Sequence, residues 1–301
     1  MKSVSQIVVP QFFSEARKLR GEFEKRFSNP LGGGGERFVW DYWHIPEQYT
    51  LLRTPAYLFF QKQLYRRFHE RLVNWGRETL GCHDVTPTWM SCYVEGCRQN
   101  LHADVPHGPW AFVYSLTPWE ARAFTGGETF LLTDEVLNRW SPESAGRALE
   151  SVQAHRLIAP RFNQLTVFDP RIPHGVREVR GVNDVRDGRL VIHGWFVNPR
   201  PFIRGALTPR ELQSRIDGMS ENFARAGLFG EGAHGVLSFR FAVSPSGHVG
   251  APKVLSHTLR SFGRDELEVQ KGIRQISKWI GEWDFPKKRS GSVVTLPLQF
   301  A

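Results

Sequence analysis

The chain has 301 residues, of which 41% are apolar and 13% aromatic, and this composition supplies a hydrophobic core and excludes an intrinsically disordered protein. The net charge is +9 at pH 7, but no run of five or more basic residues occurs, which favours a soluble protein with scattered arginines over a nucleic-acid-binding tail. The three cysteines form neither a disulfide framework nor a paired zinc motif, and no apolar stretch has the length of a signal peptide or a membrane span. We therefore expect a cytoplasmic protein with reduced thiols.

Helices are predicted ahead of the first strands of the main domain. Apolar residues recur at helical spacing over residues 11–27, and the pattern ends near Asn29-Pro30. A longer apolar stripe runs from Pro55 to about Leu80, where Gly81 stands at a position typical of a helix end. Residues 11–81 are thus expected to form a helical support for a sheet.

Short strands separated by glycine- and proline-rich turns fill residues 85–200, and this pattern is typical of a sandwich or barrel. Between them, residues 134–150 read as a helical or loop-like insertion. The predicted strands cover residues 88–94, 110–116, 126–132, 163–168, 174–179 and 189–197.

The pattern changes after residue 200. Thr208-Pro209-Arg210-Glu211 has the residues of a capping box with proline at the first helical position, which predicts a helix from there to about Ala226. Glycines then mark a linker, and a strand–strand–helix–strand unit follows. The predicted domains are residues 1–204 and 232–301, joined by a helix and linker at 205–231.

A candidate metal site lies in the main domain. His102 and Asp104 are two residues apart, so both side chains point to the same side of an extended strand. His174 is the candidate for a third ligand. Two histidines and one carboxylate on one face, with the other positions open, form the ligand set of non-haem Fe(II) oxygenases.

A series of motifs follows in order over about 115 residues. They are Tyr93-x-x-Gly96 and His102-x-Asp104, Tyr114 and Gly126-Gly127-Glu128-Thr129, Asn163-x-Leu165-x-Val167-Phe168 and His174-x-Val176, and Arg189 with Gly194-Trp195-Phe196. With these motifs, residues 85–200 resemble the Fe(II)- and 2-oxoglutarate-dependent dioxygenases, in particular their prolyl-hydroxylase-like branch.

The resemblance implies an α+β protein whose mainly β core is a double-stranded β-helix, or jelly roll, with Fe(II) held by His102, Asp104 and His174. It implies 2-oxoglutarate and O2 as co-substrates, with ascorbate as a candidate reductant. Arg189 would bind the distal carboxylate of 2-oxoglutarate, because a guanidinium can pair with it bidentately; Arg177 is the alternative, at a spacing from His174 that is short for the family.

Further co-substrate contacts are expected around Arg189. Tyr114 would donate a hydrogen bond to the same carboxylate, and Tyr93 is a second candidate contact. If Arg189 faces the barrel interior, period two places His193 and Trp195 on the same face. His193 departs from the family's usual small residue, so it either contacts 2-oxoglutarate or substrate, or is a hydrogen-bonded core histidine.

Residues 232–301 resemble the TonB C-terminal domain family. The residues that carry this resemblance are Gly235-Val236, Val243-x-x-x-Gly247-x-Val249, Ile276-x-x-Trp279 and Trp283-x-Phe285-Pro286. We carry over the fold and expect a docking or dimerisation module.

The expected activity is hydroxylation of a C–H bond on a peptide or protein, with proline as the leading target. The alternatives are a hydroxylase of a small molecule or free amino acid, and a non-catalytic 2-oxoglutarate or metal sensor that acts through the C-terminal module. Neither nucleic acid nor a membrane is an expected partner: the demethylase branch has a second arginine six positions after the first, where this chain has Trp195.

Overall fold

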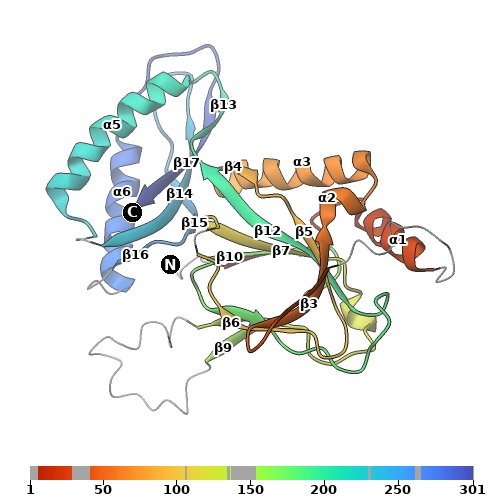
Figure 1. Cartoon of the computed structure of the whole chain (residues 1–301). Helices are drawn as coiled ribbons and strands as arrows, with labels where there is room; N and C mark the ends of the chain where they lie inside the picture. The colour runs from red at the N-terminus through yellow and green to blue at the C-terminus, as the bar shows by residue number, and fades with distance from the viewer. Residues whose placement is uncertain are drawn as a thin grey trace. The chain divides into compact units, whose positions relative to one another are not determined.

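The computed structural model describes residues 6–28, 41–105, 107–133, 136, 154–229, 232–261 and 266–300 (Figure 1). The chain divides into two compact units. The first unit comprises residues 6–72 and 85–196, and the second comprises residues 73–84 and those from 197 onward. Apart from Val136, the insertion expected at 134–150 lies outside the described residues.

The helices are α1 (Ala16–Phe27), α2 (Ala56–Phe59), α3 (Lys62–Thr79), the 3-10 helix η2 (Trp119–Ala121), α5 (Pro209–Ala226) and α6 (Glu266–Gly281). The strands of the first unit's sheet are β1 (Gln6–Val9), β2 (Asp41–Ile45), β3 (Tyr49–Pro55), β4 (Cys82–Val85), β5 (Trp89–Tyr93), β6 (Arg98–His102), β7 (Trp110–Ser115), β8 (Thr129–Leu132), β9 (His155–Ile158), β10 (Gln164–Phe168), β11 (His174–Val176) and β12 (Arg189–Pro199). The strands of the second sheet are β13 (Phe202–Gly205), β14 (Ala233–Val243), β15 (Lys253–His257), β16 (Arg260–Ser261) and β17 (Ser292–Phe300).

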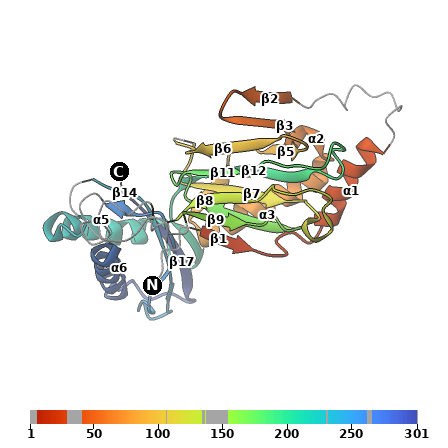
Figure 2. The ribbon, with the colours of Figure 1, turned by 90° about the horizontal axis from the view of Figure 1, so that it is seen from below.

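The first unit is a curled antiparallel sheet with the strand order β1-β10-β7-β12-β5-β3-β6-β11-β8-β9 (Figure 2). Strand β3 pairs with β5 at residues 52–55 and with β6 at residues 49–50, so it joins the two halves of the curl. Helices cover the outer face of β7: the ring of Phe68 on α3 lies 4.7 Å from that of Tyr114. The structure thus confirms the predicted α+β class with a jelly-roll-like core.

The single helix predicted from Pro55 to Leu80 is wrong. The structure has α2 and α3 instead, because Phe60 between them is extended, with ψ 156°. Phe59 and Phe60 are both buried. Consecutive positions of a helix point about 100° apart, so leaving the helix at Phe60 lets both aromatic side chains reach the core.

The three cysteines are free and buried, in keeping with the expected reduced thiols. Burial raises the pKa of Cys82 and of Cys92 to about 12, so neither side chain is a thiolate nucleophile at neutral pH. Among the helices of the described ranges, none has the length and apolar character needed to cross a membrane.

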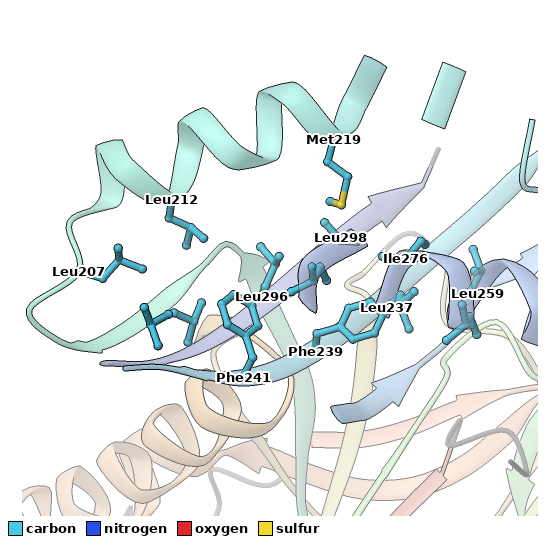
Figure 3. Close-up of a cluster of buried hydrophobic side chains, with 14 of the residues drawn as sticks. Leu207, Leu212, Met219, Leu237, Phe239, Phe241, Leu259, Ile276, Leu296 and Leu298 are labelled. Carbon is cyan, nitrogen blue, oxygen red and sulfur yellow. The ribbon is translucent and has the colours of Figure 1, made fainter. Parts of the chain in front are cut away.

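The second unit has the predicted strand–strand–helix–strand order, with the sheet β13-β17-β14-β15. Helices α5 and α6 bury their apolar side chains against one face of this sheet, where Leu212 and Met219 of α5 belong to the same buried cluster as Phe239 of β14 (Figure 3). The predicted capping box is confirmed, since Thr208 and Glu211 satisfy each other's backbone N–H groups. The structure therefore groups α5 with this sheet, whereas the sequence assigned it to a connecting segment; the resemblance to TonB domains and the docking role stay predictions.

Three hydroxyl groups of the second sheet cap the C-terminal end of α3. Ser238, Ser256 and Thr295, on three neighbouring strands, donate hydrogen bonds to the carbonyl oxygens of Leu80, Thr79 and Glu78 at 2.7, 3.4 and 3.0 Å. The last carbonyls of a helix have no partner within it, and these hydroxyl groups are buried. The bonds therefore satisfy acceptors that would otherwise be buried without a donor.

Replacement of Ser238 by alanine is expected to destabilise the protein by about 1–3 kcal/mol, because it leaves the carbonyl of Leu80 without this donor. Urea denaturation measures the change in the free energy of unfolding. Ser290→Ala, at an exposed position, is the matched control. Equal stability of the two variants would show that the cap contributes nothing.

Candidate active site

The predicted metal ligands come together at the neighbouring strands β6 and β11. His174 is the direct cross-strand partner of His102, and the two imidazole ring centroids lie 4.5 Å apart. Asp104 follows two residues after His102. One ligand atom from each of the three side chains lies within 4.8 Å of the other two, so the chain forms a candidate two-histidine, one-carboxylate metal site.

Hydrogen bonds to the backbone orient both imidazoles. The Nδ1 atom of His102 lies 2.8 Å from the carbonyl oxygen of Asn100, and that of His174 lies 2.8 Å from the carbonyl oxygen of Ile172. A carbonyl only accepts, so each Nδ1 carries a proton, and each Nε2 faces Asp104 and is the atom that would bind a metal ion in its deprotonated form. The Nε2 atoms lie 3.4 and 3.3 Å from the two carboxylate oxygens of Asp104, and all three ligand groups converge on one point.

The Asp104 carboxylate is ionised in this setting. Burial by itself would raise its pKa, but the hydrogen bonds from His102 and His174 outweigh burial and hold the pKa well below its usual range. A charged carboxylate with two neutral imidazoles matches the facial ligand set for Fe(II), which leaves further coordination positions open. The residues present therefore fit an iron ion.

The triad opens into a cavity of about 220 Å³. Of the co-substrate residues predicted from the sequence, Arg189, Tyr93, His193 and Trp195 line this cavity and Tyr114 does not. Arg189, His193 and Trp195, which were predicted to share one face of β12, do so. The residues that line the cavity include Arg53, Tyr93, His102, Asp104, Thr129, His174, Arg189, Val191, His193 and Trp195.

Arg189 is a buried cation that forms no ion pair with a carboxylate in the part of the chain that the structure describes. Its side chain lies over the Tyr93 ring, with the guanidinium carbon 4.5 Å from the ring centroid, and Nη2 donates to the hydroxyl of Thr129 at 3.1 Å. Its Nε and Nη1 are buried and have no acceptor among the described residues. Burial lowers the pKa of this 1% exposed guanidinium, so an anionic ligand in the cavity would gain two unused donors and a charge partner.

Thr129 is a contact of Arg189 for which the sequence analysis gave no role. The sequence feature that could have identified Thr129 is the Gly126-Gly127-Glu128-Thr129 motif, whose glycines have φ values of +77° and +78°. A Cβ at Gly126 would lie 1.8 Å from the carbonyl oxygen of Glu178, and one at Gly127 would contact Arg189. The glycines let the backbone turn tightly beneath the guanidinium and place Thr129 beside it.

The prediction for Tyr114 is wrong. Tyr114 pairs with Ile192 across β7 and β12, and cross-strand partners share a face. Ile192 alternates with the cavity-lining Val191 and His193, so Tyr114 points to the helical side. There its hydroxyl donates to Asn163 at 2.9 Å and cannot reach a ligand of Arg189.

Arg177 is excluded as the alternative anchor. Its side chain is 54% exposed, lies 3.6 Å from the Glu128 carboxylate and does not line the cavity. Tyr93 lies beneath Arg189, and its hydroxyl donates to the Gln99 amide oxygen at 2.9 Å. Burial raises the pKa of Tyr93 to about 12, so its phenol is neutral at physiological pH.

His193 and Trp195 both face the cavity. The Nε2 atom of His193 lies 2.8 Å from the Ser91 hydroxyl, and burial lowers the pKa of His193 to about 4. The neutral imidazole can therefore serve as a hydrogen-bonding group on the cavity wall. The Trp195 ring stacks on His107, with centroids 4.5 Å apart, and its buried indole N–H has no acceptor among the described residues.

The neutral state of His193 predicts a pH-dependent stability. When the pH falls from about 6.5, the ordinary histidine pKa, to about 4, the unfolded chain takes up a proton that the folded chain refuses. Stability therefore falls over this window, by on the order of 3 kcal/mol from this group, and the contribution is constant above it. Urea denaturation of His193→Gln across the window should show a smaller loss than the wild type, whereas His155→Gln, at an exposed histidine, should follow the wild type.

No protein-family model and no curated protein matches the chain. Among solved structures, a prolyl-4-hydroxylase from Pseudomonas putida is similar at 16% identity and a TM-score of 0.43, over 64% of this chain and 92% of that one. A 2OG-Fe(II) oxygenase family oxidoreductase from Burkholderia pseudomallei aligns at 14% identity and a TM-score of 0.42, over 64% and 85% of the two chains. HygX from Streptomyces hygroscopicus, with nickel and 2-oxoglutarate bound, aligns at 12% identity and a TM-score of 0.40, over 64% of this chain and 82% of that one.

Proposed function

We propose that the protein is an Fe(II)- and 2-oxoglutarate-dependent oxygenase that hydroxylates a C–H bond. The observation that carries the proposal is the pairing of two features in one small cavity: the His102, Asp104 and His174 triad, and Arg189 with two donors unused. A metal triad alone would suit many reactions. A buried guanidinium beside it, which forms no ion pair with a carboxylate of the described residues, favours an anionic co-substrate.

Each residue has a defined task. The triad would hold Fe(II) through two Nε2 atoms and the Asp104 carboxylate, and its bound iron would activate O2 while 2-oxoglutarate is converted to succinate and CO2. Arg189 would bind the distal carboxylate of 2-oxoglutarate, with Thr129 and Tyr93 holding the guanidinium in place. His193 and Trp195 would supply hydrogen-bonding groups on the wall of the cavity.

The substrate belongs to one of two classes. A peptidyl residue such as proline is the first, as expected from the sequence resemblance. A free amino acid or another small molecule is the second, and a specific observation favours it: Arg53, a second guanidinium without an acceptor for its buried Nε, also lines the cavity.

The test is incubation with Fe(II), 2-oxoglutarate, O2 and candidate substrates of both classes. Mass spectrometry should detect the gain of one oxygen in a substrate, and NMR should detect succinate. His174→Ala is the negative control, and product formation unaffected by that substitution would refute the proposal. Tight 2-oxoglutarate binding without succinate from any substrate would instead support a non-catalytic sensor.

A further inference from the structure

Arg53 lies on the same interior face of the curled sheet as the Arg189 side chain. It pairs with Ser91 across β3 and β5, and Ser91 pairs with Val191 across β5 and β12. Val191 lies on the cavity face between Arg189 and His193. Cross-strand partners share a face, so the register places Arg53, Ser91 and His193 in one polar strip along the cavity wall.

Two indole rings hold the Arg53 guanidinium. Its carbon lies 3.1 Å from the centroid of a Trp43 ring and 4.2 Å from that of a Trp89 ring. A planar cation between aromatic faces is held by cation–π attraction, and only its edge, where the N–H groups lie, can accept a further partner. The stacking therefore fixes the orientation of the guanidinium while leaving its hydrogen-bonding edge available.

That edge has no partner within the described residues. The Nε atom is buried without an acceptor, and Arg53 forms no ion pair with Asp41, its cross-strand partner on β2. Two other ring-stacked arginines each donate one hydrogen bond to a backbone carbonyl, Arg71 to Phe12 and Arg122 to Trp119, although the Nε of Arg122 is also buried without an acceptor. Burial also lowers the pKa of Arg53, and the opposing attraction to Asp41 and to the neighbouring tyrosines does not cancel this effect.

We propose that Arg53 binds a carboxylate group of the molecule that is hydroxylated. This inference rests on the proposed function, in which Arg189 is occupied by the distal carboxylate of 2-oxoglutarate. A planar guanidinium fixed by two indoles matches a planar carboxylate, which can accept two parallel hydrogen bonds from its edge. The neighbouring imidazole of His193, which is hydrogen-bonded to Ser91, is neutral and therefore does not repel a carboxylate.

The inference narrows the substrate class. A small cavity with guanidinium groups at two places suits a substrate whose carboxylate is near the hydroxylated carbon, such as a free or N-acylated amino acid or the last residue of a peptide. An internal residue of a peptide chain has amides on both sides and would leave Arg53 without a counter-charge. The chemistry shared by the favoured ligands is a terminal carboxylate.

Saturation-transfer NMR with matched probes tests this inference. The probes are N-acetyl amino acids, including N-acetylproline, and the corresponding N-acetyl amino acid amides, measured with and without saturating 2-oxoglutarate. In the wild type we expect the best acids to bind at least tenfold more tightly than their amides. In Arg53→Gln the affinity for the acids should fall to the affinity for the amides. In Arg53→Lys the affinity for the acids should lie between these two values, because lysine keeps the charge and loses the planar fork.

Two controls separate this site from the co-substrate site. Arg66→Gln removes an equal charge at a 79% exposed position and should leave all probe signals unchanged. The saturation-transfer signal of 2-oxoglutarate should disappear with Arg189→Gln and should remain with Arg53→Gln. Loss of the 2-oxoglutarate signal in Arg53→Gln would overturn the inference, because Arg53 would then belong to the co-substrate site.

The remaining outcomes are also decisive. Equal binding of acids and amides, no binding of any acid, or an unchanged acid signal in Arg53→Gln would each refute the inference. Failure of the wild type to bind 2-oxoglutarate would refute the proposed function instead, and the comparison of acids with amides would still decide the role of Arg53.

Discussion

His174→Ala is expected to lower metal affinity by at least roughly a hundredfold and to abolish 2-oxoglutarate turnover. Changes in groups that only support a metal ligand already cost about 10- to 100-fold, and this substitution removes a ligand itself. The Nε2 atom of His174 is one of three atoms that converge on the metal position, and a methyl group cannot replace its lone pair. Isothermal titration with Mn(II) and NMR detection of succinate measure the two losses.

The control for this prediction must separate ligand loss from unfolding. His174 is 6% exposed and lies against the Phe168 ring, with centroids 4.7 Å apart, so truncation also leaves a void. Circular dichroism should show that the variant remains folded, and His155→Ala, at an exposed histidine, should bind metal as the wild type does. Wild-type turnover in folded His174→Ala would exclude the triad as the metal site.

Two of the three metal ligands could be placed together from the sequence because their geometry is local. His102 and Asp104 are set by the two-residue period of a strand, and the same period correctly placed His193 and Trp195 beside Arg189 on β12. The approach of His174 to His102 depends on a pairing between strands far apart in the sequence. Only the order of motifs indicated that pairing, and the structure supplied the register.

Tyr114 and Arg53 show where local patterns fail. The face of Tyr114 follows from its register with Ile192, and no period within β7 alone gives the direction of the cavity. Arg53 lies on a hairpin, β2–β3, within residues 11–81, which the sequence analysis expected to form a helical support. Its role depends on Trp89, which is brought beside it by the pairing of β3 with β5. Such contacts between distant segments carry no spacing signal in a single sequence.

Arg189→Met is expected to have opposite effects on the free protein and on ligand binding. In the free protein Arg189 is a buried charge with two unpartnered nitrogens, and replacing such a charge by an apolar side chain of similar length is often neutral or stabilising by about 1–4 kcal/mol. In the complex the guanidinium would make charge-assisted bonds worth about 1.5–3 kcal/mol, so 2-oxoglutarate affinity should fall by about 10- to 100-fold.

Thermal unfolding with Mn(II), with and without 2-oxoglutarate, measures both effects at once. Ligand that binds only the folded state raises the melting temperature, so the wild type should gain stability from 2-oxoglutarate while Arg189→Met should start at an equal or higher temperature and gain little. Arg189→Lys should recover only part of the gain, because an ammonium group cannot bind a carboxylate through a planar fork. Glutaramate, which lacks both the 2-oxo group and one carboxylate, should stabilise neither protein. A melting temperature well below that of the wild type in Arg189→Met, with the 2-oxoglutarate gain intact, would mean that Arg189 supports the fold through Tyr93 and Thr129 and that the co-substrate carboxylate binds elsewhere.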